Sequence, residues 1–227
     1  TSGRRCYIAI AGTGATADQG VYRVDDDTSR LISETNNQAM SSIAYAGTID
    51  GGTLFQGRQA AIEVKYTANP TTAQPTWTVT KKILPATFVT QAMLAQANTT
   101  LVRVAPDFAR SNKVYAGTVG VQSGFSISTN GGVTFDQKAI IDLGMAAIGG
   151  ITGVGFIDHW TTPDGKTGFL CTEDAAAATY SIWKTSIPTT ADSWKRIFVV
   201  ESTAAAGRMS FGTDPAYATT STIYSFE

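Results

Sequence analysis

Histidine and cysteine are scarce in this chain of 227 residues, which holds one histidine and two cysteines. Zinc sites are built mostly from clusters of these two residue types, so the counts exclude a His/Cys metal site. The two cysteines, Cys6 and Cys171, could form one disulfide if the fold brings them together. Two buried, reduced thiols are the equally open alternative.

Charge is also sparse. Charged residues make up 15% of the chain, against about 25% in an average protein, and the formal net charge is -1. No run of lysine and arginine supplies the phosphate-neutralising surface that nucleic-acid binding needs, which excludes DNA and RNA as partners. No apolar stretch approaches the roughly 20 residues that cross a bilayer, so no transmembrane segment is predicted.

The chain begins at Thr1 without a methionine, and no signal-peptide pattern follows. We interpret this start as that of a processed or trimmed product, for which a missing signal does not argue against export. Glycine, alanine, serine and threonine are abundant, as expected for strands and tight turns. We therefore expect an extracellular or cell-surface location.

A unit of four predicted strands recurs along the chain. The clearest copy, residues 100–139, has alternating or β-branched segments separated by turns at Pro106-Asp107 and Asn130-Gly131-Gly132. Residues 40–83 and 151–200 repeat the same order. Four antiparallel strands in about 40 to 50 residues make one blade of a β-propeller. The sequence thus predicts an all-β propeller with three complete four-stranded blades.

The two ends of the chain break this unit at different places. Residues 5–33 are predicted to hold only the later strands of a blade, and residues 208–226 only the first two. We therefore expect residues 1–227 to be a single propeller domain or part of one, with a partial blade at each end. Either the chain is a fragment of a longer protein, or a second copy or another chain completes the ring.

One segment is similar to the Asp-box, or BNR, motif Ser-x-Asp-x-Gly-x-Thr-Trp, with asparagine for the aspartate and phenylalanine for the tryptophan: Ser128-Thr129-Asn130-Gly131-Gly132-Val133-Thr134-Phe135. The chain thereby resembles the Asp-box propellers, which include sialidase-like, sortilin-like and photosystem-assembly-factor-like members. The resemblance implies a structural motif at the blade periphery, away from an active face.

Each residue of this motif has an expected structural role. Asn130 should bond the backbone of its own turn, the two glycines should accept positive φ, and Thr134 should pair across the hairpin. Phe135 should pack between neighbouring blades. Trp77 and Trp194 occupy the equivalent position in the other two complete blades and are expected to pack in the same way.

Candidate catalytic groups are few. Sialidases, which share Asp boxes, gather three arginines around a carboxylate, and Arg58, Arg103 and Arg208 lie near predicted strands but in no recognisable sialidase context. Glycosidases need two carboxylates facing one another across a cleft. The candidates lie in predicted blade loops, where forming a turn is the alternative role: Asp107, Asp158 and Asp174.

His159, the one histidine, follows Asp158 at the predicted end of a strand. No Gly-x-Ser-x-Gly elbow accompanies it, so a satisfied loop histidine is the alternative to a catalytic triad. The run Asp25-Asp26-Asp27 offers oxygens for calcium, and a solvated hairpin tip is its alternative. No other cofactor is predicted.

The favoured hypothesis is a non-catalytic extracellular propeller that acts as a cell-surface, S-layer-like structural or binding module for proteins or glycans. It depends on the low charge, the composition and the long loops at 67–76 and 186–193. A fragment of a glycoside hydrolase, sialidase-like or xyloglucanase-like, is one alternative. The other is an assembly factor that docks on a membrane complex, which would need a basic patch that the sequence does not supply.

Overall fold

The computed structural model describes residues 3–11, 19–33, 39–58, 63–81, 99–119, 124–140, 154–162, 164–174, 179–186, 193–201 and 210–226. These residues form five separate antiparallel sheets, in which each strand is hydrogen-bonded to the next along the chain. Short turns make this order possible, because an antiparallel neighbour needs only a hairpin connection.

We name the sheets A to E in chain order. Sheet A contains β1 (Arg5–Ile10), β2 (Gly20–Asp25) and β3 (Thr28–Leu31). Sheet B contains β4 (Met40–Thr48), β5 (Gly51–Arg58), β6 (Val64–Thr67) and β7 (Thr78–Val79). Sheet C contains β8 (Thr99–Val104), β9 (Val114–Val119), β10 (Gly124–Ser128) and β11 (Asp136–Ile140).

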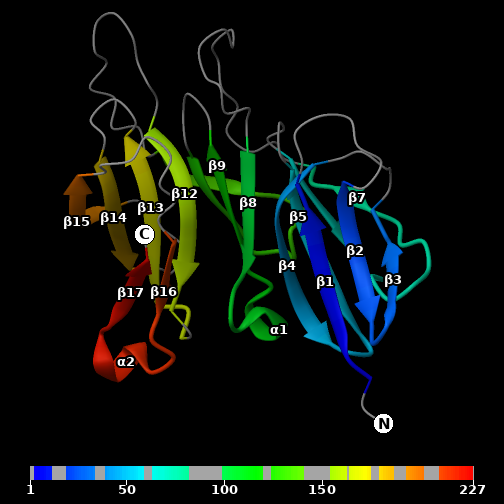
Figure 1. The fold of residues 1–227 in the computed structure, drawn as a ribbon. Coiled ribbons are helices and arrows are strands. Elements are labelled where there is room, and N and C mark those ends of the chain that lie inside the picture. The colour runs from blue at the N-terminus through cyan, green and yellow to red at the C-terminus, as the bar shows by residue number, and fades with distance from the viewer. Residues whose placement is uncertain are drawn as a thin grey trace, which may run out of the picture.

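Sheet D contains β12 (Val154–Thr161), β13 (Thr167–Asp174), β14 (Thr179–Ser186) and β15 (Lys195–Glu201), and sheet E contains β16 (Ser210–Thr213) and β17 (Ile223–Phe226). Two single-turn helices, α1 (Phe108–Ser111) and α2 (Tyr217–Thr220), lie between the first and second strands of sheets C and E. They lie at the same end of the sheets (Figure 1). Within the described residues, neither helix has the length or the apolar character to cross a membrane.

The sheets stand side by side, and their first strands form the contacts between neighbours (Figure 1). β1 packs against β4, β4 against β8, β8 and β9 against β12, and β12 against β16. Four-stranded meanders stacked through their first strands are the blades of a β-propeller. Sheets B, C and D are complete blades and sheets A and E are partial ones, which confirms the predicted fold.

The strand assignment predicted for residues 5–33 is wrong. β1 contacts β4 as β4 contacts β8, so β1 occupies a first-strand position, and sheet A holds the first three strands of a blade. Sheet E holds a first and a second strand, as predicted. The rank of a strand within its blade is set by packing between sheets, which the local pattern of residues 5–33 does not encode.

The hydrophobic core is a series of layers between adjacent sheets. Because successive residues of a strand point to opposite faces, one strand serves two layers. On β13, Leu170 packs towards sheet C, whereas Phe169 and Cys171 pack with Tyr217 of α2. The core is therefore continuous across the arc of blades.

The two cysteines are free, which contradicts the disulfide alternative. Cys6 lies on β1 in sheet A and Cys171 on β13 in sheet D, and sheets B and C stand between them (Figure 1). The alternative of two buried thiols holds for Cys171, which is buried, but not for Cys6, which is exposed.

Candidate functional site

The turn between the third and fourth strands of sheet C is closed by its own side chains. The Asn130 Oδ1 accepts a hydrogen bond from the Thr134 amide at 3.0 Å, and the Asn130 Nδ2 donates to the Thr134 Oγ1 at 2.8 Å. The Ser128 Oγ accepts a hydrogen bond from the Gly132 amide at 2.9 Å. Thr134 therefore bonds within its own turn rather than across the hairpin as predicted, because Asn130 faces it directly.

The two glycines of this turn have the positive φ predicted for them, 71° at Gly131 and 86° at Gly132. A Cβ on Gly132 would lie 2.6 Å from the ring of Phe55, so this position accepts no side chain without movement of the ring. The Gly131 amide donates to the carbonyl of Asn112, which caps α1. The turn is thus fixed both to its own sheet and to sheet B.

Phe135 ends the turn and is fully buried between two sheets, as predicted. It packs in one cluster with Phe55 and Val64 of sheet B and with Val102 and Val114 of sheet C. Such a ring removes a large apolar area from water and fixes the distance between the sheets.

Trp77 and Trp194 repeat this arrangement in sheets B and D. Trp77 packs with Val21 of sheet A and donates its Nε1–H to the carbonyl of Ile32 at 2.7 Å. Trp194 meets the ring of Phe125 in sheet C edge-on, with centroids 5.3 Å apart. In all three blades the aromatic before the fourth strand joins its sheet to the preceding one, so this element is structural.

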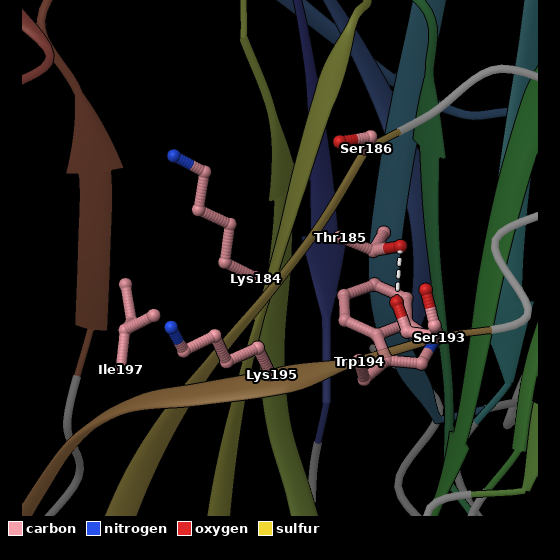
Figure 2. A pocket seen from close by; sticks show the side chains of 7 residues that line it. All are labelled: Lys184, Thr185, Ser186, Ser193, Trp194, Lys195 and Ile197. Carbon is pink, nitrogen blue, oxygen red and sulfur yellow. Dashed lines mark hydrogen bonds between the residues drawn. The ribbon is translucent and has the colours of Figure 1, made fainter.

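In sheet D, the strand ends that precede and follow the corresponding connection line a groove. A pocket of about 440 Å³ lies between the end of β14 and the start of β15 (Figure 2). Its volume is within the range of ligand sites in proteins. The Thr185 Oγ1 donates to the Ser193 carbonyl at 2.6 Å and holds the two strands together at this point (Figure 2). The pocket is lined by Lys184, Thr185, Ser186, Ser193, Trp194, Lys195 and Ile197.

Two lysines give this groove a positive charge. Lys184 on β14 and Lys195 on β15 are direct cross-strand partners. In the part of the chain that the structure describes, no carboxylate forms an ion pair with either of them. Like charges placed opposite one another on two strands are destabilising, so an anion between them would be favourable. The Lys184 ammonium also lies 5.7 Å from the ring centroid of Tyr217, within range of a cation–π interaction.

The indole of Trp194 lies on the other side of these strands from the two lysines, against Phe125 of sheet C (Figure 2). Its Nε1 is buried and has no hydrogen-bond acceptor among the described residues, whereas the equivalent Trp77 donates to Ile32. Trp194 therefore belongs to the joint between sheets C and D.

The arginines considered for a sialidase site are not gathered. Arg58 ends β5 and its guanidinium contacts the carboxylate of Glu63 at 3.3 Å. Arg103 lies on β8 in the next sheet, and Arg208 lies outside the described residues. No three-arginine site is therefore present among the residues that the structure describes.

Asp107 is held by side chains of α1. It occupies the N-cap position of this helix, and its carboxylate accepts hydrogen bonds from the Ser111 Oγ at 2.8 Å and from the Arg110 guanidinium at 3.2 Å. These hydrogen bonds, led by that from Ser111, hold the pKa of Asp107 below its ordinary value. These contacts fit the turn-forming alternative for Asp107.

Asp158 and Asp174 lie in strands, not in the loops predicted for them, and His159, predicted at the end of a strand, lies within β12. β12 continues to Thr161, with Asp158 opposite Cys171 and His159 opposite Leu170, and Asp174 is the last residue of β13. The strands extend beyond their apolar segments because the backbone ladder continues through polar residues. The side chains of these three residues lie outside what the structure describes.

The run Asp25-Asp26-Asp27 forms the tip of the β2–β3 hairpin. Asp25 receives the Nε of Arg5 at 2.5 Å and the Nε of Arg23 at 2.7 Å. Burial raises the pKa of Asp25, but the hydrogen bond from Arg5 and the charges of both arginines outweigh it, and the net pKa is lowered. The described residues hold no cluster of three or more His, Cys, Asp or Glu able to bind a metal ion. Asp25 is thus held by two arginines where the hairpin turns.

The lysines of the groove are the functional candidates that the sequence did not single out. Both flank the long loop predicted at 186–193, and that loop was the available signal. Their position opposite one another follows from the β14–β15 register, which a sequence pattern alone does not give.

No protein-family model and no curated protein matches this chain. Among solved structures it is similar to an ancestral GH74 enzyme, with a TM-score of 0.55 and 15% identity over 85% of this chain and 25% of that one. It is also similar to the periplasmic gluconolactonase PpgL of Pseudomonas aeruginosa (TM-score 0.47, 10% identity, 93% of this chain and 72% of that one) and to YCF48 bound to D1 peptide (0.44, 11%, 93% and 63%). The likeness to the GH74 enzyme supports the fold alone. The chain spans a quarter of the length of the GH74 enzyme.

Proposed function

We propose that this propeller is a non-catalytic binding module, at the cell surface or outside the cell, that holds an anionic group of a protein or glycan in the groove between β14 and β15. One observation supports the proposal: Lys184 and Lys195 are cross-strand partners that both line the groove, and no described carboxylate forms an ion pair with either of them. A ligand carboxylate placed between the two ammonium groups would relieve their repulsion and gain charge-assisted hydrogen bonds.

The state of the acidic side chains supports binding without catalysis. Hydrolysis by a pair of carboxylates needs one acid whose pKa is raised so that it can donate a proton. Among the described aspartates, the resolved shifts at Asp25, Asp107 and Asp164 are all downward. For Asp164 the largest cause is the hydrogen bond from Thr162, followed by that from the Lys166 amide. Such groups are suited to holding turns.

The scaffold part of the proposal is that the turn at 128–135 is a degenerate Asp box. Asn130 takes the place of the aspartate and still accepts a hydrogen bond from the Thr134 amide through its carbonyl oxygen. The aromatic position holds Phe135 and keeps its place between two sheets. The low charge and the Ser/Thr/Gly-rich composition support the surface location.

Binding of two defined anionic probes tests the function. Fluorescein-labelled hexaglutamate and oligogalacturonate present carboxylates on a peptide and on a glycan. We expect the chain to bind at least one of them, with affinity that falls as salt is raised. Lys184→Glu should weaken binding by at least about tenfold, since it turns an attractive contact into a repulsive one.

The matched control is Lys166→Glu, which makes the same change in net charge at an exposed turn between β12 and β13. This variant should bind within about twofold of the parent, because rim or distant charges contribute little. Equal binding by the Lys184 variant and the parent would refute the groove. New reducing ends released from oligogalacturonate would refute the non-catalytic assignment.

A further inference from the structure

One glutamine between sheets A and B is buried without a hydrogen-bond partner. Gln56 on β5 is 0% exposed, and neither its Nε2 nor its Oε1 has a partner among the described residues. It lies two residues after Leu54, which packs with Val21 of sheet A, so the alternation along a strand turns both side chains towards sheet A. A buried amide without partners is costly to fold and is rare in proteins.

The neighbours of Gln56 on this face are charged. Lys65 on β6 is its direct cross-strand partner and is 7% exposed. Arg58 lies two residues further along β5, and its Nε is buried without a partner among the described residues. The Glu63 Oε1 lies 3.3 Å from the Arg58 Nη1 and 3.8 Å from the Lys65 Nζ. These four residues, the Gln56 cluster, therefore carry two positive charges and one negative charge.

The equivalent positions of sheet D are apolar. Phe55 on β5 and Phe169 on β13 each meet edge-on the aromatic ring of the helix in the following sheet. The next residues, Gln56 in sheet B and Leu170 in sheet D, are therefore equivalent. Leu170 is the cross-strand partner of Trp183, and both pack against core residues of sheet C. Joining two sheets at this position thus needs neither an amide nor a charged group.

We propose that the Gln56 cluster binds a small hydroxycarboxylate at the end of the sheet A–B joint opposite α1 (Figure 1). The unpartnered N–H groups of Gln56 and Arg58 suit a carboxylate, and its negative charge balances the net charge of the cluster. The unpartnered Oε1 of Gln56 suits a hydroxyl group on the same molecule.

The dimensions of the cluster fit a ligand of this size. Side chains two residues apart on one face of a strand start about 6.6 Å from one another, a span that a carboxylate and its hydrogen bonds bridge. The side chains of Arg58 and Glu63 are 27% and 26% exposed, so they lie at the rim, whereas Gln56 and Lys65 lie deeper.

This site goes beyond the proposed binding function and shares no residue with the groove of sheet D. Gln56→Leu should leave the binding of hexaglutamate and oligogalacturonate unchanged, and Lys184→Glu should leave the new site unchanged. Failure of either proposal therefore leaves the other intact.

Thermal unfolding in sodium glycolate, compared with sodium acetate and sodium chloride at equal ionic strength, measures binding. A ligand that binds only the folded chain raises Tm, and the dependence of Tm on its concentration gives Kd. We expect glycolate to raise Tm by at least about 2 °C over chloride. Acetate should raise it less, because acetate has no hydroxyl group for the Gln56 Oε1.

Gln56→Leu should abolish the response to glycolate. In chloride this variant should be at least as stable as the parent, because an apolar side chain of similar size replaces an amide without partners, and this stability shows that it is folded. Arg58→Lys keeps a positive charge beside Glu63 but lacks the Nε–H donor, and should weaken glycolate binding by at least about tenfold. Gln137→Leu, the same change at an exposed position of β11, should respond like the parent.

Equal Tm values of the parent in glycolate and chloride would overturn the proposal. A response to glycolate that persists in Gln56→Leu, or that is lost in Gln137→Leu, would overturn it as well, because the ligand would then bind elsewhere. A Gln56→Leu variant less stable than the parent in chloride would show that the amide serves the fold without a ligand. Equal responses of the parent to glycolate and acetate would overturn the assignment of a hydroxycarboxylate.

Discussion

Sheets C and D share the aromatic residue before the fourth strand and differ in the residues around it. Phe135 in sheet C and Trp194 in sheet D each pack on the preceding sheet. In sheet C, Asn130 and Thr134 bond to one another before the fourth strand, whereas in sheet D the end of β14 and the start of β15 line a groove. The aromatic joint is therefore the part that the two sheets share, and the residues beside it are free to differ.

The outer strands of the same two sheets differ in the same way. β11 begins with polar and charged residues, and β15 begins with Lys195 and Arg196, but four exposed apolar residues follow them in β15. Departures from the repeat thus gather at one margin of sheet D, where the groove and the edge strand lie next to one another. In a repeat protein, a position that departs from its equivalents is a better guide to function than a position that follows them.

The largest loss of stability is expected at the aromatic residues that join one sheet to the preceding one. Phe135→Ala removes a fully buried ring and should lower the free energy of unfolding by about 3 to 5 kcal/mol. Trp194→Ala should cost less, because Trp194 is only partly buried. Urea unfolding followed by far-UV circular dichroism measures both. We expect Phe135, between sheets B and C, to be more tightly packed than Trp194, between sheets C and D. A smaller loss of unfolding free energy in the Phe135 variant than in the Trp194 variant would contradict this.

The two glycines of the sheet C turn provide an internal control for each other. Gly132→Ala should destabilise by about 1 to 3 kcal/mol, since it combines a positive φ with a close approach to the Phe55 ring. Gly131→Ala meets nothing within 4 Å and should cost only about 1 kcal/mol for its φ. Thermal or urea unfolding of the two variants should rank them in this order, and equal values would argue against the contact with Phe55.

Substitutions of Asn130 test the Asp-box interpretation of the sheet C turn. Asn130→Ala removes two hydrogen bonds to Thr134 and should cost about 1 to 2 kcal/mol in the free energy of unfolding. Asn130→Asp keeps an acceptor for the Thr134 amide and for its hydroxyl, and should stay within about 0.5 kcal/mol of the parent. If the aspartate destabilised as much as the alanine, the turn would depend on the amide donor and would not be a variant of the motif.

The smallest expected effect is a pH dependence of stability that comes from one tyrosine. Tyr115 on β9 and Tyr224 on β17 occupy equivalent positions in the second strands of sheets C and E. Tyr115 is fully buried and Tyr224 is 51% exposed. Burial raises the pKa of Tyr115 to about 12. The unfolded chain releases this proton near pH 10, so the contribution of Tyr115 is fully present below pH 10 and is lost as the pH rises towards 12. Tyr115→Phe should flatten the fall in stability over this window, and absorbance at 295 nm should show one late-titrating tyrosine fewer. A titration identical to that of the parent would contradict the burial of this hydroxyl.

Much of the fold was predictable because its signals are local. The alternating segments and the Asn130-Gly131-Gly132 turn predict strands and hairpins directly, and the repeat order predicts the blades. The position of β1 within its blade was not predictable, since it depends on the contact with β4. The continuation of β12 through Asp158 and His159 was missed for the same reason, because a ladder formed with β13 overrides local polarity.

The candidate site was the least predictable part. Phe135, Trp77 and Trp194 were identified because they repeat, and the repeat is the signal. Lys184 and Lys195 do not repeat, and their apposition arises from a register that contains a shift between Ile182 and Trp183. A one-residue change of register moves a side chain to the other face of a sheet, so such a pair is visible only in the structure.

The most direct test of the difference between the two turns is hydrogen exchange of the chain with and without hexaglutamate, read by mass spectrometry on peptides that cover both turns. We expect the probe to slow exchange at the end of β14 and the start of β15 and to leave the turn at 128–135 unchanged. Slowed exchange at 128–135 with none beside Lys184 and Lys195 would contradict the assignment of one turn to the scaffold and the other to the ligand.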